Sequence, residues 1–211
     1  MWSIYPVTAV VLMLAVFQPA HAQDRLPPIP ASEMSQAQRT IVETFEIERG
    51  YALRGPWVPL LRSPEILDLM IDVRDHVRDR SLLTFKHTEF VILLAAREWT
   101  QHYVWNAHYP AAIEAGLDPE VIVAIADGRR PEHMSDQEGI LYDLSMELHR
   151  NKQVSDATYD QAVGVFGQER VVEAVAIGGY YSLLAMVMNT GRTPLRDGVE
   201  LPPVTLSSFP R

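Results

Sequence analysis

The 211-residue sequence contains no cysteine. Without a thiol the chain can form no disulfide, no thiolate metal site, no iron–sulfur cluster and no cysteine redox cycle. Thiol-dependent oxidoreductases are therefore excluded, and any catalysis has to depend on other side chains.

Positive charge is scarce, because 18 Lys and Arg stand against 27 Asp and Glu and give a formal net charge of −9. The Lys and Arg residues form no cluster along the sequence. This composition argues against nucleic acid and against an anionic membrane surface as partners.

Cofactor and metal motifs are also missing. Gly178-Gly179 has no phosphate-binding lysine beside it, and no His-Glu-x-x-His sequence occurs. Glu98 and His102 offer two metal ligands on one helix face, whereas a protein metal site needs three convergent ligands. The sequence therefore predicts neither a cofactor nor a metal site.

Residues 1–23 contain no Lys, Arg, Asp or Glu, and an apolar run from Val7 to Phe17 precedes Ala20-His21-Ala22. This small-x-small pattern predicts a signal peptide, residues 1–22, that is cleaved after Ala22. A membrane anchor is the alternative, but the run is shorter than the roughly 20 residues of a spanning helix. No later segment is predicted to span a membrane, so we expect a periplasmic or secreted protein without stable membrane insertion.

No segment of useful length alternates between apolar and polar residues, so the sequence offers no source for a sheet. Helix-start signals are instead frequent. They predict an all-α single domain of about eight helices, and they occur at Ser35 with Gln38, Ser63-Pro64-Glu65, Asp118-Pro119-Glu120, Ser135 with Glu138, and Ser155.

The domain layout follows from these signals and from the prolines. Residues 23–54 form a proline-containing leader with one helix, and residues 50–59 are predicted to be a loop. Residues 55–191 form the main helical domain, whose last two helices are separated near Gly167. The tail, residues 192–211, contains four prolines and is predicted to be irregular.

Unusual polar side chains gather between residues 85 and 116. Glu89 lies on the apolar side of a predicted helix, where an unpaired carboxylate is costly. Gln101, Val104 and His108 share one stripe of the next helix at spacings of three and seven. On one straight helix Glu89 and His108 would lie about 28 Å apart, so they can meet only if the chain folds back, and Thr100 is the predicted cap at that break.

Structural roles for the same residues remain open. His108 can be a core histidine that bonds Glu89 or a carbonyl without performing chemistry. Tyr103 and Trp105 can be packing residues, and His102 is expected at the surface or in an interface.

Several sequence blocks resemble the carboxymuconolactone decarboxylase and alkylhydroperoxidase D-like family. The resemblance implies a helical bundle of the alkylhydroperoxidase D-like type and a symmetric homo-oligomer of three or six chains. The blocks are Gly55-Pro56-Trp57, Leu83 to Leu94, Tyr103-Val104-Trp105-Asn106-Ala107-His108, Ala115-Gly116-Leu117, and Gly178-Gly179-Tyr180-Tyr181.

The resemblance also implies a proton-relay pair. Glu89 and His108 match the family's relay residues, whereas Gln101 and Val104 occupy the positions of the two cysteines that the peroxidase branch requires. A thiol peroxidase mechanism is therefore excluded. The decarboxylase branch needs no cysteine, and it implies an exported lyase or isomerase that acts by acid–base chemistry on a small carboxylated or lactone substrate.

In this hypothesis His108 is the general acid and base, and Glu89 orients it. The substrate would contact Gln101, Val104, Trp105, Tyr103 and Tyr180. The alternative is a non-catalytic helical oligomer that binds a small ligand or has an accessory role. The least favoured alternative is a peroxidase that borrows its redox centres from a partner.

Overall fold

The computed structural model describes residues 24–195, 198 and 200–206, and the predicted signal peptide lies outside this part. The described chain contains helices and no strand, which confirms the all-α prediction. Its eight helices are α1 (Gln36–Arg49), α2 (Trp57–Leu60), α3 (Pro64–Asp79), α4 (Phe85–Glu98), α5 (His102–Glu114), α6 (Pro119–Ala126), α7 (Asp136–Asn151) and α8 (Asp156–Gly191).

Most predicted helix starts are present. Ser35 with Gln38 and Ser135 with Glu138 form complete capping boxes at α1 and α7. Two local predictions are wrong. The hydroxyl of Ser63 caps no backbone N–H, because this residue has a φ of −129° and a ψ of 85°. The predicted loop of residues 50–59 contains the start of the short helix α2.

Gly167 divides α8 as the sequence predicted. Its φ of 78° and ψ of 158° are not helical, and the positive φ favours glycine. By length and composition α8 could cross a membrane, so the expectation that no later segment is apolar enough is wrong. In the most apolar 18-residue stretch of α8, 50% is nevertheless buried inside the fold. Burial of this kind is also found in core helices of helical domains.

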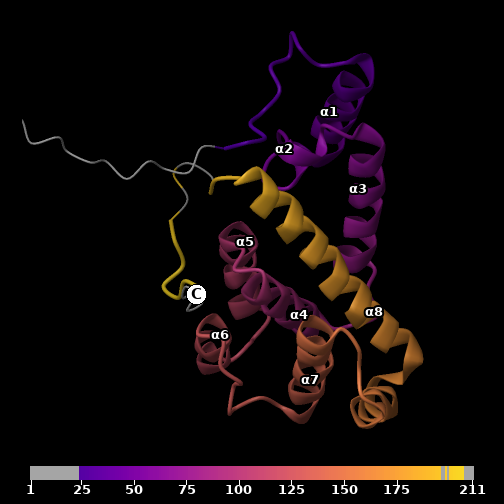
Figure 1. Cartoon of the computed structure of the whole chain (residues 1–211), viewed down its shortest axis with the longest axis vertical. Helices are drawn as coiled ribbons and strands as arrows, with labels where there is room; N and C mark the ends of the chain where they lie inside the picture. Colours follow the sequence, from indigo (N-terminus) through magenta and orange to yellow (C-terminus); the bar gives the residue numbers. More distant parts are fainter. Residues whose placement is uncertain (1–23, 196–197, 199, 207–211) are drawn as a thin grey trace, which may run out of the picture.

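Helix α4 lies at the centre and contacts α5, α7 and α8 (Figure 1). A helix that is apolar on all sides has to be surrounded by other elements, and α4 is buried continuously from His87 to Arg97. In Figure 1, α8 runs diagonally between the group α1–α3 and the group α4–α7. The tail packs back on α5, where Trp105 Nε1 donates a hydrogen bond of 2.8 Å to the carbonyl of Val204.

The chain reverses between α4 and α5, at the place that the sequence indicated. Thr100 has a positive φ of 46°, so it is part of the reversal and not the helix cap. Gln101 is the cap, because its extended backbone lets its side chain accept the N–H of Tyr103 at 2.7 Å. This reversal turns α5 back along α4.

Candidate functional site

The reversal brings Glu89 of α4 and His108 of α5 into contact. Glu89 is fully buried, and its Oε2 lies 2.8 Å from His108 Nδ1. The side chain of His108 is 14% exposed. The contact expected from the sequence is therefore present, although the two residues are 19 positions apart.

A third member of this cluster, Arg78 of α3, was missed by the sequence analysis. Arg78 Nη1 forms an ion pair with Glu89 Oε1 and lies 3.4 Å from His108 Nδ1. The sequence does contain a signal for it, since Met70, Arg74 and Arg78 follow one another at intervals of four and so lie on one side of α3.

The charges of this cluster follow from burial and from its contacts. Burial lowers the pKa of His108 and nearby Arg78 and Arg74 lower it further, which together outweigh the opposing effect of Glu89. Burial would raise the pKa of Glu89, but the hydrogen bond to His108 and the charge of Arg78 lower it below its usual value. At neutral pH the site therefore holds a neutral imidazole, a carboxylate and a guanidinium.

The tautomer of His108 follows from the same contacts. An ionised carboxylate accepts but cannot donate, so the 2.8 Å contact with Glu89 requires a proton on Nδ1. Arg78 can then make only a charge contact with that nitrogen at 3.4 Å. Nε2 is left without a proton, and it can accept one from another molecule.

His108 lines a cavity of about 500 Å³ between α2, α3, α5 and α8. Tyr181 packs edge-on against the imidazole, with ring centroids 4.9 Å apart. The described lining residues include no Asp or Glu. They are three arginines, six aromatic or histidine side chains and smaller groups: Tyr51, Arg54, Pro56, Trp57, Arg74, Arg78, Tyr103, Val104, Asn106, Ala107, His108, Tyr180, Tyr181, Leu184, Met188 and Leu195.

Three of the five predicted contact residues, Tyr103, Val104 and Tyr180, line this cavity. Gln101 does not, because both ends of its amide are used inside the fold. Its Oε1 caps α5 and its Nε2 donates to Asn189 Oδ1 at 2.8 Å.

Trp105 is also absent from the cavity wall. Its side chain is fully buried, and its indole N–H bonds the tail. The prediction that Gln101 and Trp105 border the site is wrong, since one fixes the reversal and the other anchors the tail.

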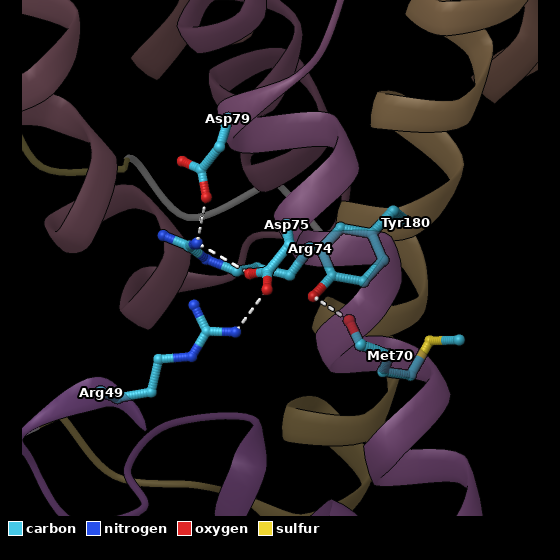
Figure 2. A network of polar contacts seen from close by, with 6 residues as sticks. All are labelled: Arg49, Met70, Arg74, Asp75, Asp79 and Tyr180. Atoms are coloured by element: carbon cyan, nitrogen blue, oxygen red, sulfur yellow. Dashed lines mark hydrogen bonds and ion pairs between the residues drawn. The ribbon is translucent and has the colours of Figure 1, made fainter. Parts of the chain in front are cut away.

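Tyr180 of the cavity wall bonds α3 near a network of ion pairs on that helix (Figure 2). Its hydroxyl donates to the carbonyl of Met70 at 3.1 Å, and burial raises its pKa far above the usual value. Arg74 Nη1 contacts Asp75 at 3.0 Å and Asp79 at 2.7 Å. Tyr180 is therefore a neutral residue of the cavity wall, and its hydroxyl hydrogen is already used in the hydrogen bond to Met70.

The part of the chain that the structure describes contains no group of three His, Asp or Glu side chains that could hold a metal ion. His108 offers the cavity the exchange of a proton at Nε2, beside a carboxylate that stabilises the charged imidazolium.

Solved structures with the same architecture identify the fold. Uncharacterised peroxidase-related proteins from Ralstonia eutropha JMP134, described as an alkylhydroperoxidase AhpD core, and from Silicibacter sp. TM1040 share 15% and 12% identity with this chain. Each comparison covers 82% of this chain, with 92% and 91% of the other chains and TM-scores of 0.65 and 0.66. The chain has the alkylhydroperoxidase D-like fold.

A third structure is the debrominase Bmp8, solved as a variant in complex with 2,3,4-tribromopyrrole. It shares 9% identity over 83% of this chain and 94% of its own, with a TM-score of 0.62. No protein-family model and no curated protein sequence matches the chain.

Proposed function

We propose that this protein is a cofactor-independent lyase or isomerase that moves a proton on a small carboxylated or lactone substrate bound beside His108. The observation that supports this most is that His108 lines a cavity while its Nδ1 lies 2.8 Å from Glu89 Oε2. An imidazole fixed in this way presents Nε2 as a ready base.

Each member of the cluster has a distinct role in this proposal. Nε2 of His108 takes a proton from the substrate, and the resulting imidazolium faces the carboxylate of Glu89. The same proton then returns to the product. Arg78 keeps Glu89 ionised and in place, so it is a positioning residue.

A thiol peroxidase fits the site less well. The positions of the peroxidase cysteines are Gln101 and Val104, and the sequence contains no cysteine at all. Bmp8 supports catalysis on small molecules as a use of this fold, since it is described as a debrominase bound to a bromopyrrole.

A non-catalytic ligand-binding protein is the second candidate. The specific observation in its favour is that Arg78 and Glu89 already compensate each other's charge, as in a purely structural ion pair.

Substitution of His108 tests the proposal against this alternative. Purified protein is incubated with a panel of small carboxylated lactones, and conversion is followed by NMR. We expect His108→Gln to lower turnover by about 10²–10⁴-fold. His102→Gln is the matched control, because His102 is exposed on the same helix, and it should retain the wild-type rate.

Unchanged turnover in folded His108→Gln would contradict the proposal. Ligands that bind the wild type without being converted would support the non-catalytic alternative.

We also propose that the protein is exported to the periplasm or the medium and forms a homo-oligomer of three or six chains. The second half of α8 supports assembly, because Val172, Val175 and Met186 are exposed there and large apolar surfaces mark interfaces. N-terminal sequencing should begin at Gln23, and light scattering should give a mass of three or six chains. Intact Met1 or a monomer mass would contradict these proposals.

A further inference from the structure

Two of the three arginines that line the cavity are already compensated. Arg78 is paired with Glu89. Arg74 contacts Asp75 and Asp79 (Figure 2), and Asp75 also binds Arg49 at 2.6 Å. Within this network the positive and negative charges balance, so it leaves no cation for a bound anion.

Arg54 is the third arginine and differs from the other two. Its guanidinium carbon lies 3.9 Å from the centroid of the Tyr51 ring, and the residue lines the cavity while it is exposed to solvent. Among the described residues no carboxylate forms an ion pair with it. Stacking on an aromatic ring fixes the guanidinium plane and leaves its edge free to bind a carboxylate.

Asn106 supplies a second unsatisfied group in the same cavity. Its Nδ2 is buried, and it has no hydrogen-bond partner in the described part of the chain. A buried N–H donor without a partner is unfavourable, and an acceptor atom of a bound molecule would relieve this cost.

The position of Asn106 on α5 limits what it can contact. Successive helical residues are rotated by about 100°, so Asn106 and His108, two positions apart, point in nearly opposite directions. Both line the cavity, so they border different parts of it. The unpartnered Nδ2 of Asn106 therefore faces a part of the cavity away from His108.

On the basis of the proposed function, we infer that the cavity takes a planar monoanion whose carboxylate is bound by Arg54 and whose uncharged carbonyl oxygen accepts a hydrogen bond from Asn106. One uncompensated cation matches one negative charge. The rings of Tyr51, Trp57 and Tyr103 in the cavity wall suit a flat molecule. A dianion would bring a second charge for which the described residues that line the cavity leave no free cation.

Four probes separate the parts of this inference by calorimetric binding. Coumalate is a planar lactone with one carboxylate, and methyl coumalate lacks its charge. Benzoate keeps the charge but lacks the lactone carbonyl, and isophthalate adds a second carboxylate to benzoate. We expect wild-type protein to bind coumalate about tenfold more tightly than methyl coumalate, and to bind isophthalate no more tightly than benzoate.

Variants assign the contacts to residues. Arg54→Gln should weaken coumalate about tenfold and leave methyl coumalate unchanged. Arg129→Gln removes a similarly exposed charge outside the cavity and should change neither. Asn106→Leu should weaken coumalate about fivefold without affecting benzoate. If that variant fails to fold, Asn106→Asp, which replaces the donor with a negative acceptor of the same shape, should weaken coumalate at least as much.

The inference is overturned if coumalate fails to bind the wild type, if Arg54→Gln binds it as tightly, or if isophthalate binds better than benzoate. If the Asn106 variant loses as much affinity for benzoate as for coumalate, the contact between Asn106 and the carbonyl oxygen is overturned. These experiments need no turnover, and His108→Gln should still bind coumalate. If the four probes bind as expected but no substrate is converted, only the proposed function is contradicted. If a substrate is converted equally well by Arg54→Gln, only this inference is contradicted.

Discussion

Two buried carboxylates, Glu89 on α4 and Glu138 on α7, have almost the same burial and a lowered pKa, yet they lie in different surroundings. Glu138 occupies the first turn of α7, where it accepts the N–H of Ser135 at 2.8 Å and pairs with Lys86 at 2.7 Å. Helix capping explains its contact with Ser135, and the pair with Lys86 of α4 compensates its charge.

Glu89 lies in the interior of α4, where backbone N–H groups already bond within the helix. Its partners come from other helices, namely Arg78 of α3 and His108 of α5. Moving these charged side chains out of water costs free energy, and hydrophobic side chains of similar volume at the same positions would often give an equally stable or more stable fold. The two carboxylates therefore share burial and a lowered pKa, and they differ in that both partners of Glu89, Arg78 and His108, line the cavity of about 500 Å³.

The largest expected difference between the two carboxylates is the effect of replacing each with glutamine on stability and turnover. Glu89→Gln leaves Arg78 buried without its counter-charge, so we expect the free energy of unfolding to fall by about 3 kcal/mol and turnover to fall by about 10²-fold. Glu138→Gln should cost about 1 kcal/mol and leave turnover intact. Urea unfolding and rate measurements at pH 7 check both, and equal effects of the two variants would remove the distinction.

Acidification should have a smaller effect on stability than these substitutions, and the effect should depend on His108. The pKa of His108 is lowered in the folded state, so the unfolded chain binds its proton more readily. The resulting stabilisation is complete above the unfolded pKa of about 6.5 and is lost as the pH falls toward the folded pKa.

Between pH 7 and 5.5 the wild type should therefore lose more stability than His108→Gln. The slopes should differ by at most about 1.4 kcal/mol per pH unit, the limit for one proton. Thermal unfolding across this range measures the difference. Parallel curves would show that His108 keeps an ordinary pKa in the fold.

The smallest effect is expected at the cap itself. Ser135→Ala removes the hydroxyl that accepts the N–H of Glu138 at 3.3 Å, and loss of such a cap costs about 1 kcal/mol. Turnover and coumalate binding should not change, since neither residue lines the cavity. A loss of turnover in this variant would show that Glu138 or its helix start contributes to activity.

The sequence predicts much of this fold because helix starts are local signals. Ser35 and Ser135 act on residues within one turn, so their effect is visible without knowing the tertiary structure. The contact between Glu89 and His108 is predictable for a related reason. Both are polar groups on apolar stripes, and a single reversal of the chain is enough to join them.

Contacts that depend on a third helix could not be predicted in the same way. The rotation of α3 about its axis decides whether Arg78 faces Glu89 or solvent. The spacing of Met70, Arg74 and Arg78 places them on one side of α3, but it does not determine what that side faces. Gln101 was assigned to the substrate because its stripe faces inward, but its amide caps α5 and bonds Asn189. Trp105 binds the tail at Val204, and tail packing has no signal in the helical spacing.

The proposed function depends most on the protonation of His108, and NMR of protein labelled with ¹⁵N in its imidazoles measures it without a known substrate. His108→Gln identifies the signals of this residue among the seven histidines. We expect the neutral form with its proton on Nδ1 at pH 7, and a pKa below the usual value of about 6.5. A proton on Nε2 in the neutral form, or a pKa above 7, would contradict the assignment of His108 as the base.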